Sequence, residues 1–148
     1  MTLTTNFIIS DPYALPKEVF DYCQEIVGTV NPQWKHEQPD QEHNWFKNSR
    51  FRNLPFQGFS AILDVEYGAD GPLNKYEDSN EPDGFIKISF DTAYGYRGHN
   101  GEGCDQLHAS YIRKLGKWCE EKGWKYAWQN EYTGEWFNDW KLADNLST

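Results

Sequence analysis

The residues best suited to chemistry gather in residues 94–108, YGYRGHNGEGCDQLH. Four glycines there separate aromatic, basic and thiol side chains, between an alternating apolar run and a helical pattern. In a strand, glycine loop and helix arrangement, backbone N–H groups and the helix dipole can hold an anion. Neither the P-loop spacing nor a dinucleotide-binding fingerprint is present, however, and a flexible turn uses the same glycines. The stretch therefore predicts either a plain turn or a small-anion site with Tyr94, Arg97 and His99.

A metal site is the second chemistry that this stretch suggests. Cys104 and His108 stand four residues apart, so a helix places them on one face, and His99 could complete a zinc ligand set. Both fall on the apolar stripe of the predicted helix, where a packed cysteine and a hydrogen-bonded core histidine are typical. We expect no metal and no cofactor, and keep His99, Cys104 and His108 as the alternative ligands.

Nucleophilic catalysis has no candidate that the sequence selects. A Cys and His pair must be in contact, with an exposed thiolate, and nothing in the spacing of the three cysteines and four histidines chooses one pair. Catalytic residues are therefore unassigned, and a protein without enzymatic activity is favoured.

A second candidate site lies in WKYAWQNEYTGEWF, residues 124–137. The alternating rings and the central turn predict a hairpin. Tyr132, Trp136 and Trp140 exceed what one helix-facing side can bury, so at least one ring should be exposed beside carboxylates. Trp and Tyr dominate binding hot spots, although ordinary surface rings would look alike. The predicted recognition residues of this hairpin are Asn130, Glu131, Tyr132, Glu135 and Trp136.

Basic and aromatic residues also alternate in WFKNSRFR, residues 45–52, a mixture that stacks on single-stranded bases. Three acids, Glu37, Asp40 and Glu42, come just before it. A loop that covers a sheet edge would have the same composition, so nucleic-acid contact here is the less favoured interpretation.

The elements that position these residues follow from periodicity. Helices are predicted at 16–28 and from Cys104 to Lys122, with Gly123 as the stop. Strands are predicted at 6–10, 59–67, 85–91, 124–129 and 135–138, with an irregular connection over 31–58 that holds at most one short strand, and an acidic loop at 66–83. The predicted class is α+β: a mostly antiparallel sheet of four to five strands with two helices packed on one face. Strands 85–91 and 124–129 would be parallel if they are adjacent.

Composition limits the partners. The 148 residues predict a single domain, 1–148, and 14 Lys+Arg against 23 Asp+Glu give a net charge of −9, which argues against duplex nucleic acid. No apolar stretch is long enough for a membrane span or a signal peptide. Three cysteines, an odd number, indicate reduced thiols, so we expect a soluble cytoplasmic protein.

Two segments carry a resemblance: FDTAYGYRGHNGEGCDQLH at 90–108 and WCEEKGWKYAWQNEYTGEW at 118–136. Here the chain resembles an uncharacterised group of small acidic proteins encoded by tailed phages of actinobacteria. The likeness extends to LPKEVFDYCQEIVG at 15–28 and EYGADGP at 66–72. It implies no known activity, fold or catalytic residue. It implies the cytoplasm of an infected bacterium, where small phage proteins often act by binding a host component.

Two functions remain open. The first is a phage protein without enzymatic activity that binds a host or phage macromolecule, most simply a protein, in host takeover or counter-defence. The second is a small-ligand, nucleotide or metal-binding protein, including a hydrolase, with its site at residues 94–108. The absence of a recognisable catalytic constellation favours the first.

Overall fold

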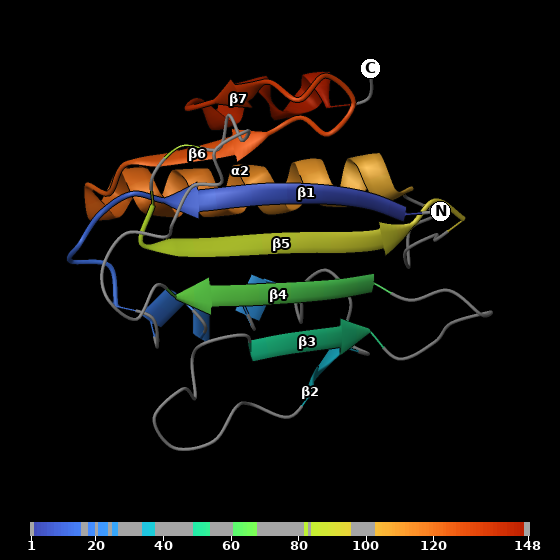
Figure 1. Cartoon of the computed structure of the whole chain (residues 1–148), viewed down its shortest axis with the longest axis horizontal. Helices are drawn as coiled ribbons and strands as arrows, with labels where there is room; N and C mark the ends of the chain where they lie inside the picture. The colour runs from blue at the N-terminus through green and yellow to red at the C-terminus, as the bar shows by residue number, and fades with distance from the viewer. Residues whose placement is uncertain are drawn as a thin grey trace.

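The computed structural model describes residues 2–15, 18–19, 21–23, 25–26, 34–37, 49–53, 61–67, 82, 84–95 and 103–146. For residues 2, 34–37, 49–53, 61–67, 93 and 145 it describes only the backbone. The strands are β1 (Thr2–Ile9), β2 (Trp34–Glu37), β3 (Ser49–Asn53), β4 (Ala61–Tyr67), β5 (Ile86–Ala93), β6 (Tyr126–Gln129) and β7 (Trp136–Phe137). The helices with defined bounds are α2 (Cys104–Lys122) and the 3-10 helix η2 (Trp140–Asn145). This arrangement confirms the α+β class (Figure 1).

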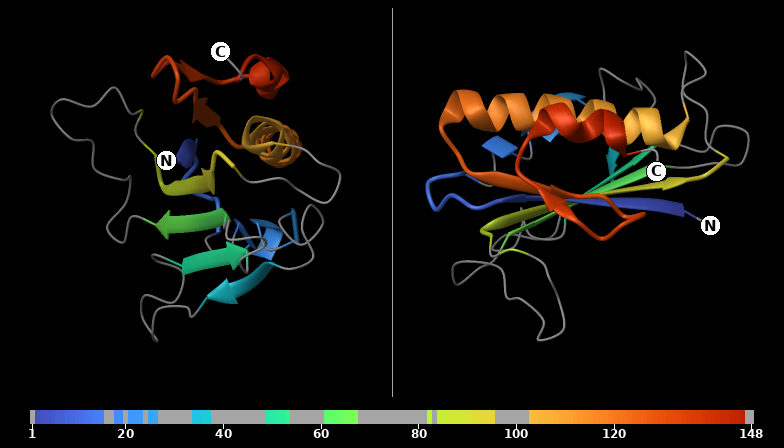
Figure 2. Two further views of the ribbon diagram at one scale, coloured as in Figure 1. Left: turned by 90° about the vertical axis from the view of Figure 1, so that its right-hand side faces the viewer. Right: turned by 90° about the horizontal axis from the view of Figure 1, so that it is seen from above.

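All seven strands join one sheet in the order β2-β3-β4-β5-β1-β6-β7, and every neighbouring pair is antiparallel. Strand β1 lies between β5 and β6, so the chain begins in the middle of the sheet (Figure 1). Helices α2 and η2 both lie on one side of the sheet (Figure 2). No helix among the described residues is long and apolar enough to cross a membrane.

Alternation along β1 and β5 forms the core face. In β5, Ile86, Ile88, Phe90 and Thr92 are buried, and the residues between them are half-buried. In β1, Leu3, Thr5, Phe7 and Ile9 are buried, Thr4 and Asn6 are half-buried, and Ile8 is buried as well. The period-2 pattern thus places one apolar face of the sheet against α2.

Helix α2 covers this face with the stripe that the sequence predicted. Leu107, Tyr111, Ile112, Leu115 and Cys119 are buried. Gly123 ends the helix in the left-handed conformation, at a φ of 75°, which favours glycine. The predicted bounds of this helix are confirmed.

The structure describes only part of the other predicted helix, at residues 16–28. Residues 18–19, 21–23 and 25–26 are helical. Val19, Cys23 and Ile26 join the core, and the Tyr22 ring stacks on Trp118 of α2 at 4.3 Å between centroids. The full extent over 16–28 lies outside the described residues, so a second helix with those bounds stays a prediction.

Two expectations about the sheet were wrong. The sheet has seven strands instead of four or five, because β2 and β3 lie within residues 31–58, which lack a clear period and were assigned to an irregular connection. Strands β5 and β6 are not an adjacent parallel pair, because β1 lies between them and pairs with both.

The C-terminal hairpin is confirmed. In β6 and β7, Trp128 pairs with Phe137 and Gln129 with Trp136. Helix η2 then returns over α2, where Trp140 lies against Gly116.

Candidate recognition site

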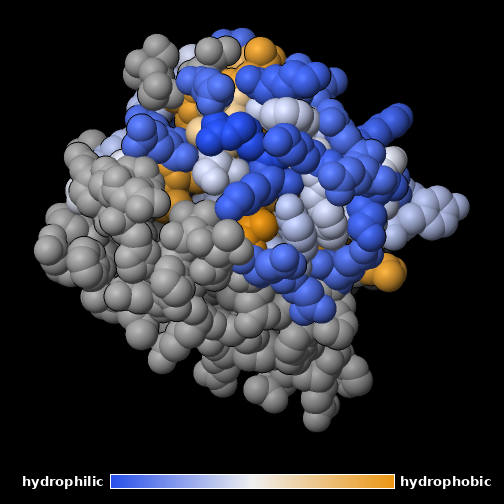
Figure 3. All heavy atoms as spheres, turned by 180° about the vertical axis from the view of Figure 1, so that it is seen from behind, coloured by the Kyte–Doolittle hydropathy of each residue, from blue (hydrophilic) through white to orange (hydrophobic). Residues whose placement is uncertain are grey.

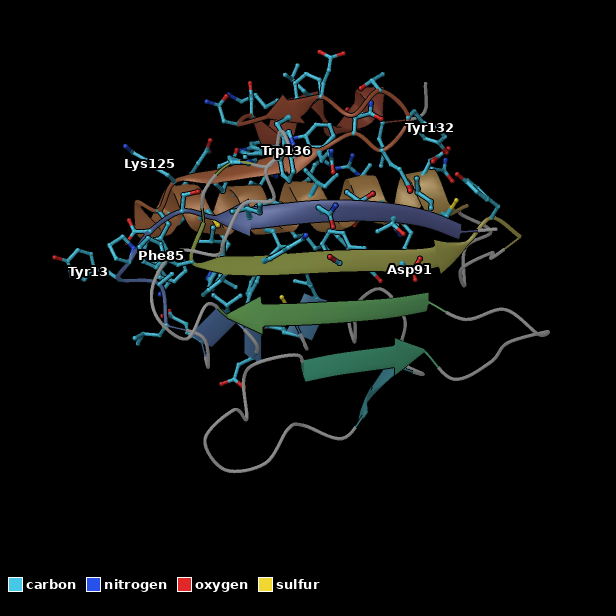
Figure 4. All side chains as sticks on the ribbon, in the orientation of Figure 1. Tyr13, Phe85, Asp91, Lys125, Tyr132 and Trp136 are labelled. Atoms are coloured by element: carbon cyan, nitrogen blue, oxygen red, sulfur yellow. The ribbon has the colours of Figure 1, made fainter. Side chains whose placement is uncertain are left out.

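The hairpin tip lies against the N-terminus of α2, so two segments that the sequence suggested separately meet at one end of the molecule. The Tyr132 hydroxyl donates to Oδ1 of Asp105, in the first turn of α2, at 2.7 Å. Tyr94, just after β5, is close enough to interact electrostatically with Tyr132. Figure 4 shows Tyr132 and Asp91 toward the same end of the sheet, and Tyr13 at the opposite end.

Local hydrogen bonds fix the shape of the tip. Asn130 is buried, and its Oδ1 accepts from the backbone N–H of Tyr132 at 2.9 Å, a link that asparagine commonly makes in turns. The N–H of Gly134 donates to the Asn130 carbonyl at 2.7 Å, and Gly134 has a φ of 76°. The tip therefore presents Tyr132 from a rigid turn.

One carboxylate of the tip bonds to the sheet, and the same sheet residue bonds to a second carboxylate. Glu131 accepts a hydrogen bond from the backbone N–H of Thr4 in β1. The Thr4 hydroxyl donates to Oδ1 of Asp91 in β5 at 3.0 Å. Together with Asp105 and the exposed Glu135, these groups make the described part of this end acidic.

The three rings that one side of the hairpin cannot all bury, Tyr132, Trp136 and Trp140, differ in exposure, and Tyr94 is compared with them. Tyr132 is 38% exposed and Tyr94 is 37% exposed. Trp136 and Trp140 are half-buried. The exposed ring beside Glu131 and Glu135 that the sequence predicted is therefore Tyr132.

The half-buried tryptophans have different surroundings. Trp140 donates from Nε1 to Oε2 of Glu120 at 2.8 Å, and the Nζ of Lys117 lies 4.7 Å from its ring centroid. The Nε1 of Trp136 is buried and has no acceptor among the described residues. Trp140 is thus held by its own chain, whereas Trp136 keeps an unused donor beside Gln129.

Burial raises the pKa of the Tyr132 hydroxyl above its ordinary value, and the hydrogen bond to Asp105 and the charge of that carboxylate raise it further. The phenol therefore stays protonated and neutral at physiological pH, and it acts as a donor to Asp105. A protonated phenol held in this way is suited to binding and not to nucleophilic attack.

Cys104 and His108 lie in the core, as their place on the apolar stripe predicted. His108 is fully buried, with Nδ1 2.8 Å from the Thr5 hydroxyl and Nε2 2.8 Å from the Thr92 hydroxyl. A metal at either ring nitrogen would cost one of these hydrogen bonds. Groups of three or more metal-ligating side chains are absent from the part of the chain that the structure describes.

The structure describes only part of the predicted anion site, because Arg97 and His99 lie outside the described residues. At the start of α2, the N–H of Gly103 donates to Oε1 of Gln106 at 3.2 Å, and Asp105 places a negative charge in the first turn. The chain itself thus uses one backbone N–H at this end of α2, and the carboxylate of Asp105 opposes a bound anion.

Sequence reasoning missed the contacts that assemble this end of the molecule. Nothing in the pattern paired Tyr132 with Asp105 or Glu131 with Thr4. The sequence did contain one signal for the buried partners of His108: Thr5 and Thr92 are polar residues at core-facing strand positions.

Comparison with protein-family models, with curated proteins and with solved structures found no match. The resemblance to actinobacterial phage proteins therefore stays a prediction.

Proposed function

We propose that this protein acts without enzymatic activity, by binding a protein partner through the hairpin tip and the N-terminus of α2. The observation that carries this proposal is the exposed Tyr132 ring. Its hydroxyl donates a hydrogen bond to Asp105, and its backbone N–H donates one to the side chain of Asn130. A rigid tyrosine offers a large contact area and loses little conformational entropy on binding, as hot-spot residues do. Tyr94 enlarges the same surface.

The setting belongs to the proposal as well. The phage resemblance and the three cysteines, which are buried and form no disulfide in the structure, fit a protein of the bacterial cytoplasm during infection. There it would bind a host or phage protein, in host takeover or counter-defence.

The alternative site for a small ligand or metal has less support. His108 already uses both ring nitrogens, and the first turn of α2 carries its own carboxylate. Neither observation favours a nucleotide or a hydrolytic reaction at residues 94–108.

The test is capture of a partner from bacterial extract on the immobilised protein, identified by mass spectrometry. Tyr132→Ala should weaken capture by about 30-fold, because truncating a hot-spot ring costs about 2 kcal/mol or more. Its melting temperature should fall only modestly, since the ring is partly exposed and the change removes one hydrogen bond, to Asp105. Tyr13→Ala is the matched control: Tyr13 is 82% exposed and lies at the opposite end of the sheet (Figure 4).

The outcomes separate the surfaces. Loss of capture in Tyr132→Ala and its retention in Tyr13→Ala support the proposal. Neutralising Glu77, Asp78 and Glu81 together should have a much smaller effect; these residues belong to the predicted acidic loop and lie outside the described residues. If those charges matter and Tyr132 does not, the binding surface is electrostatic and lies elsewhere.

A further inference from the structure

We infer that the partner presents an arginine-containing basic segment, and that an arginine side chain docks on the Tyr94 and Tyr132 rings among the surrounding carboxylates. This inference rests on the proposed function and names the chemistry of the partner. It follows from the joint placement of two exposed rings and four acids.

The two rings are suited to a cation. The face of a tyrosine ring is negative, and it attracts an ammonium or guanidinium group placed over it. Tyr94 and Tyr132 are exposed to similar extents and lie near one another, although 38 positions separate them in the sequence. Two rings offered together make a larger acceptor surface than either ring alone.

Among the described residues around the rings, the charged side chains are all acidic. Asp91, Asp105, Glu131 and Glu135 lie on the segments that form this end. The described residues 88–95, 103–107 and 126–140 include no lysine, arginine or histidine. The hydrogen bonds of Asp105 and Glu131 to Tyr132 and Thr4 each involve one carboxylate oxygen, so the other oxygen can accept from a ligand. A cation on the rings would therefore find carboxylate acceptors beside it.

The basic side chains that the structure describes lie on other segments: Lys87 in β5, Lys125 just before β6, and five on α2 and η2. Arg113, Lys114, Lys117 and Lys122 are on α2, and Lys141 is on η2. Several are already engaged: Arg113 pairs with Asp144 at 2.6 Å, and Lys117 lies over Trp140. The coloured part of the face in Figure 3, seen from behind the view of Figure 1, is mostly hydrophilic with scattered apolar spots. The tip therefore has the charge that complements a basic partner.

Arginine fits this surface better than lysine does. Its planar guanidinium can stack on a ring and donate two hydrogen bonds to a carboxylate at the same time. Lysine offers a compact, strongly hydrated charge without that planar geometry.

The experiment uses two fluorescein-labelled peptides, each with four arginines separated by serines, in one of which citrulline replaces every arginine. Citrulline keeps the planar shape and removes the charge. Fluorescence anisotropy with the full-length protein at low salt should show that the arginine peptide binds at least about tenfold more tightly. Binding should weaken as salt is added.

Two pairs of variants locate the binding. The double variant Tyr94→Ala with Tyr132→Ala should lose about tenfold, and Tyr132→Phe, which keeps the ring, should stay within about twofold. E131Q/E135Q should bind several-fold more weakly. E25Q/E121Q makes the same change in net charge near Tyr22, far along α2 from Asp105, and should stay close to wild type.

Three results would overturn the inference: equal binding of the arginine and citrulline peptides, no binding of either, or equal losses in E131Q/E135Q and E25Q/E121Q. The last would mean that net charge alone attracts the peptide. If Tyr132→Ala abolishes capture from extract while the arginine peptide does not bind, the proposed function stands and the basic partner is rejected.

Discussion

At the scale of single residues, His108 is the group on which the core most depends for its polar contacts. On α2, it lies over the paired strands β1 and β5, with a threonine hydroxyl at each ring nitrogen. In the neutral ring, one nitrogen donates to a hydroxyl and the other accepts from one. A protonated ring would donate from both nitrogens, so one threonine hydroxyl would have to rotate. Burial lowers the pKa of His108 from 6.5 to about 3.

This depressed pKa predicts a loss of stability in acid. Above pH 6.5 both folded and unfolded chains hold a neutral ring, so His108 adds no pH dependence. Between pH 6.5 and about 3 only the unfolded chain binds the proton, so the free energy of unfolding falls as the pH falls, by up to about 1.4 kcal/mol per pH unit from this group. Denaturant unfolding from pH 7.5 to 4.5 should show this slope.

The variant His108→Gln isolates the contribution, because the carboxylates titrate equally in both proteins. Its stability should depend less on pH than that of the wild type. If the variant does not fold, the ring carbon shifts of His108 in the wild type provide the check. A ring that protonates near pH 6.5 in the folded protein contradicts the prediction.

At the scale of elements, the contact between α2 and η2 depends on one glycine. A Cβ at Gly116 would lie 2.4 Å from Cβ of Trp140, closer than real Cβ atoms approach. Glycine in a helix interior ordinarily costs about 1 kcal/mol relative to alanine. Its presence in α2 is explained by the close approach of η2.

Gly116→Ala should therefore destabilise the protein, by about 1–3 kcal/mol in denaturant unfolding, because overpacking outweighs the gain in helix propensity. Ser110→Ala, at a half-buried position in the same helix, is the control and should change the stability by less than about 0.5 kcal/mol. Stabilisation by Gly116→Ala would mean that η2 does not pack on α2 in this way.

At the scale of the whole molecule, β1 holds the sheet together. Its residues Phe7, Ile8 and Ile9 have a strand on each side and are fully buried. Strand β7 has two residues and lies at the edge of the sheet. Opening of the molecule should therefore start at the edge and reach β1 last.

Hydrogen exchange of backbone amides tests this order. The amides of Phe7, Ile8 and Ile9 should exchange only on global unfolding and at least about tenfold more slowly than those of Trp136 and Phe137. Comparable rates in the two strands would show that the sheet unfolds as one unit.

The sequence by itself determined the elements whose signals are local. The apolar stripe from Leu107 to Cys119 and the stop at Gly123 defined α2, and alternation through Ile86, Ile88 and Phe90 defined β5. The turn between the rings of β6 and β7 defined the hairpin. Each of these patterns repeats within a few residues, so backbone geometry alone gives it meaning.

Only the tertiary structure decided which of these elements meet. The bonds from Tyr132 to Asp105 and from His108 to Thr5 join positions 27 and 103 residues apart. Strands β2 and β3 likewise carry too little periodicity to be recognised; β3 is defined by its pairing with β4, and β2 by its pairing with β3. Contacts of this kind depend on how the whole chain packs, and no local pattern encodes a partner at such a distance. The surface formed by Tyr94, Tyr132 and the neighbouring carboxylates therefore exists only in the folded molecule.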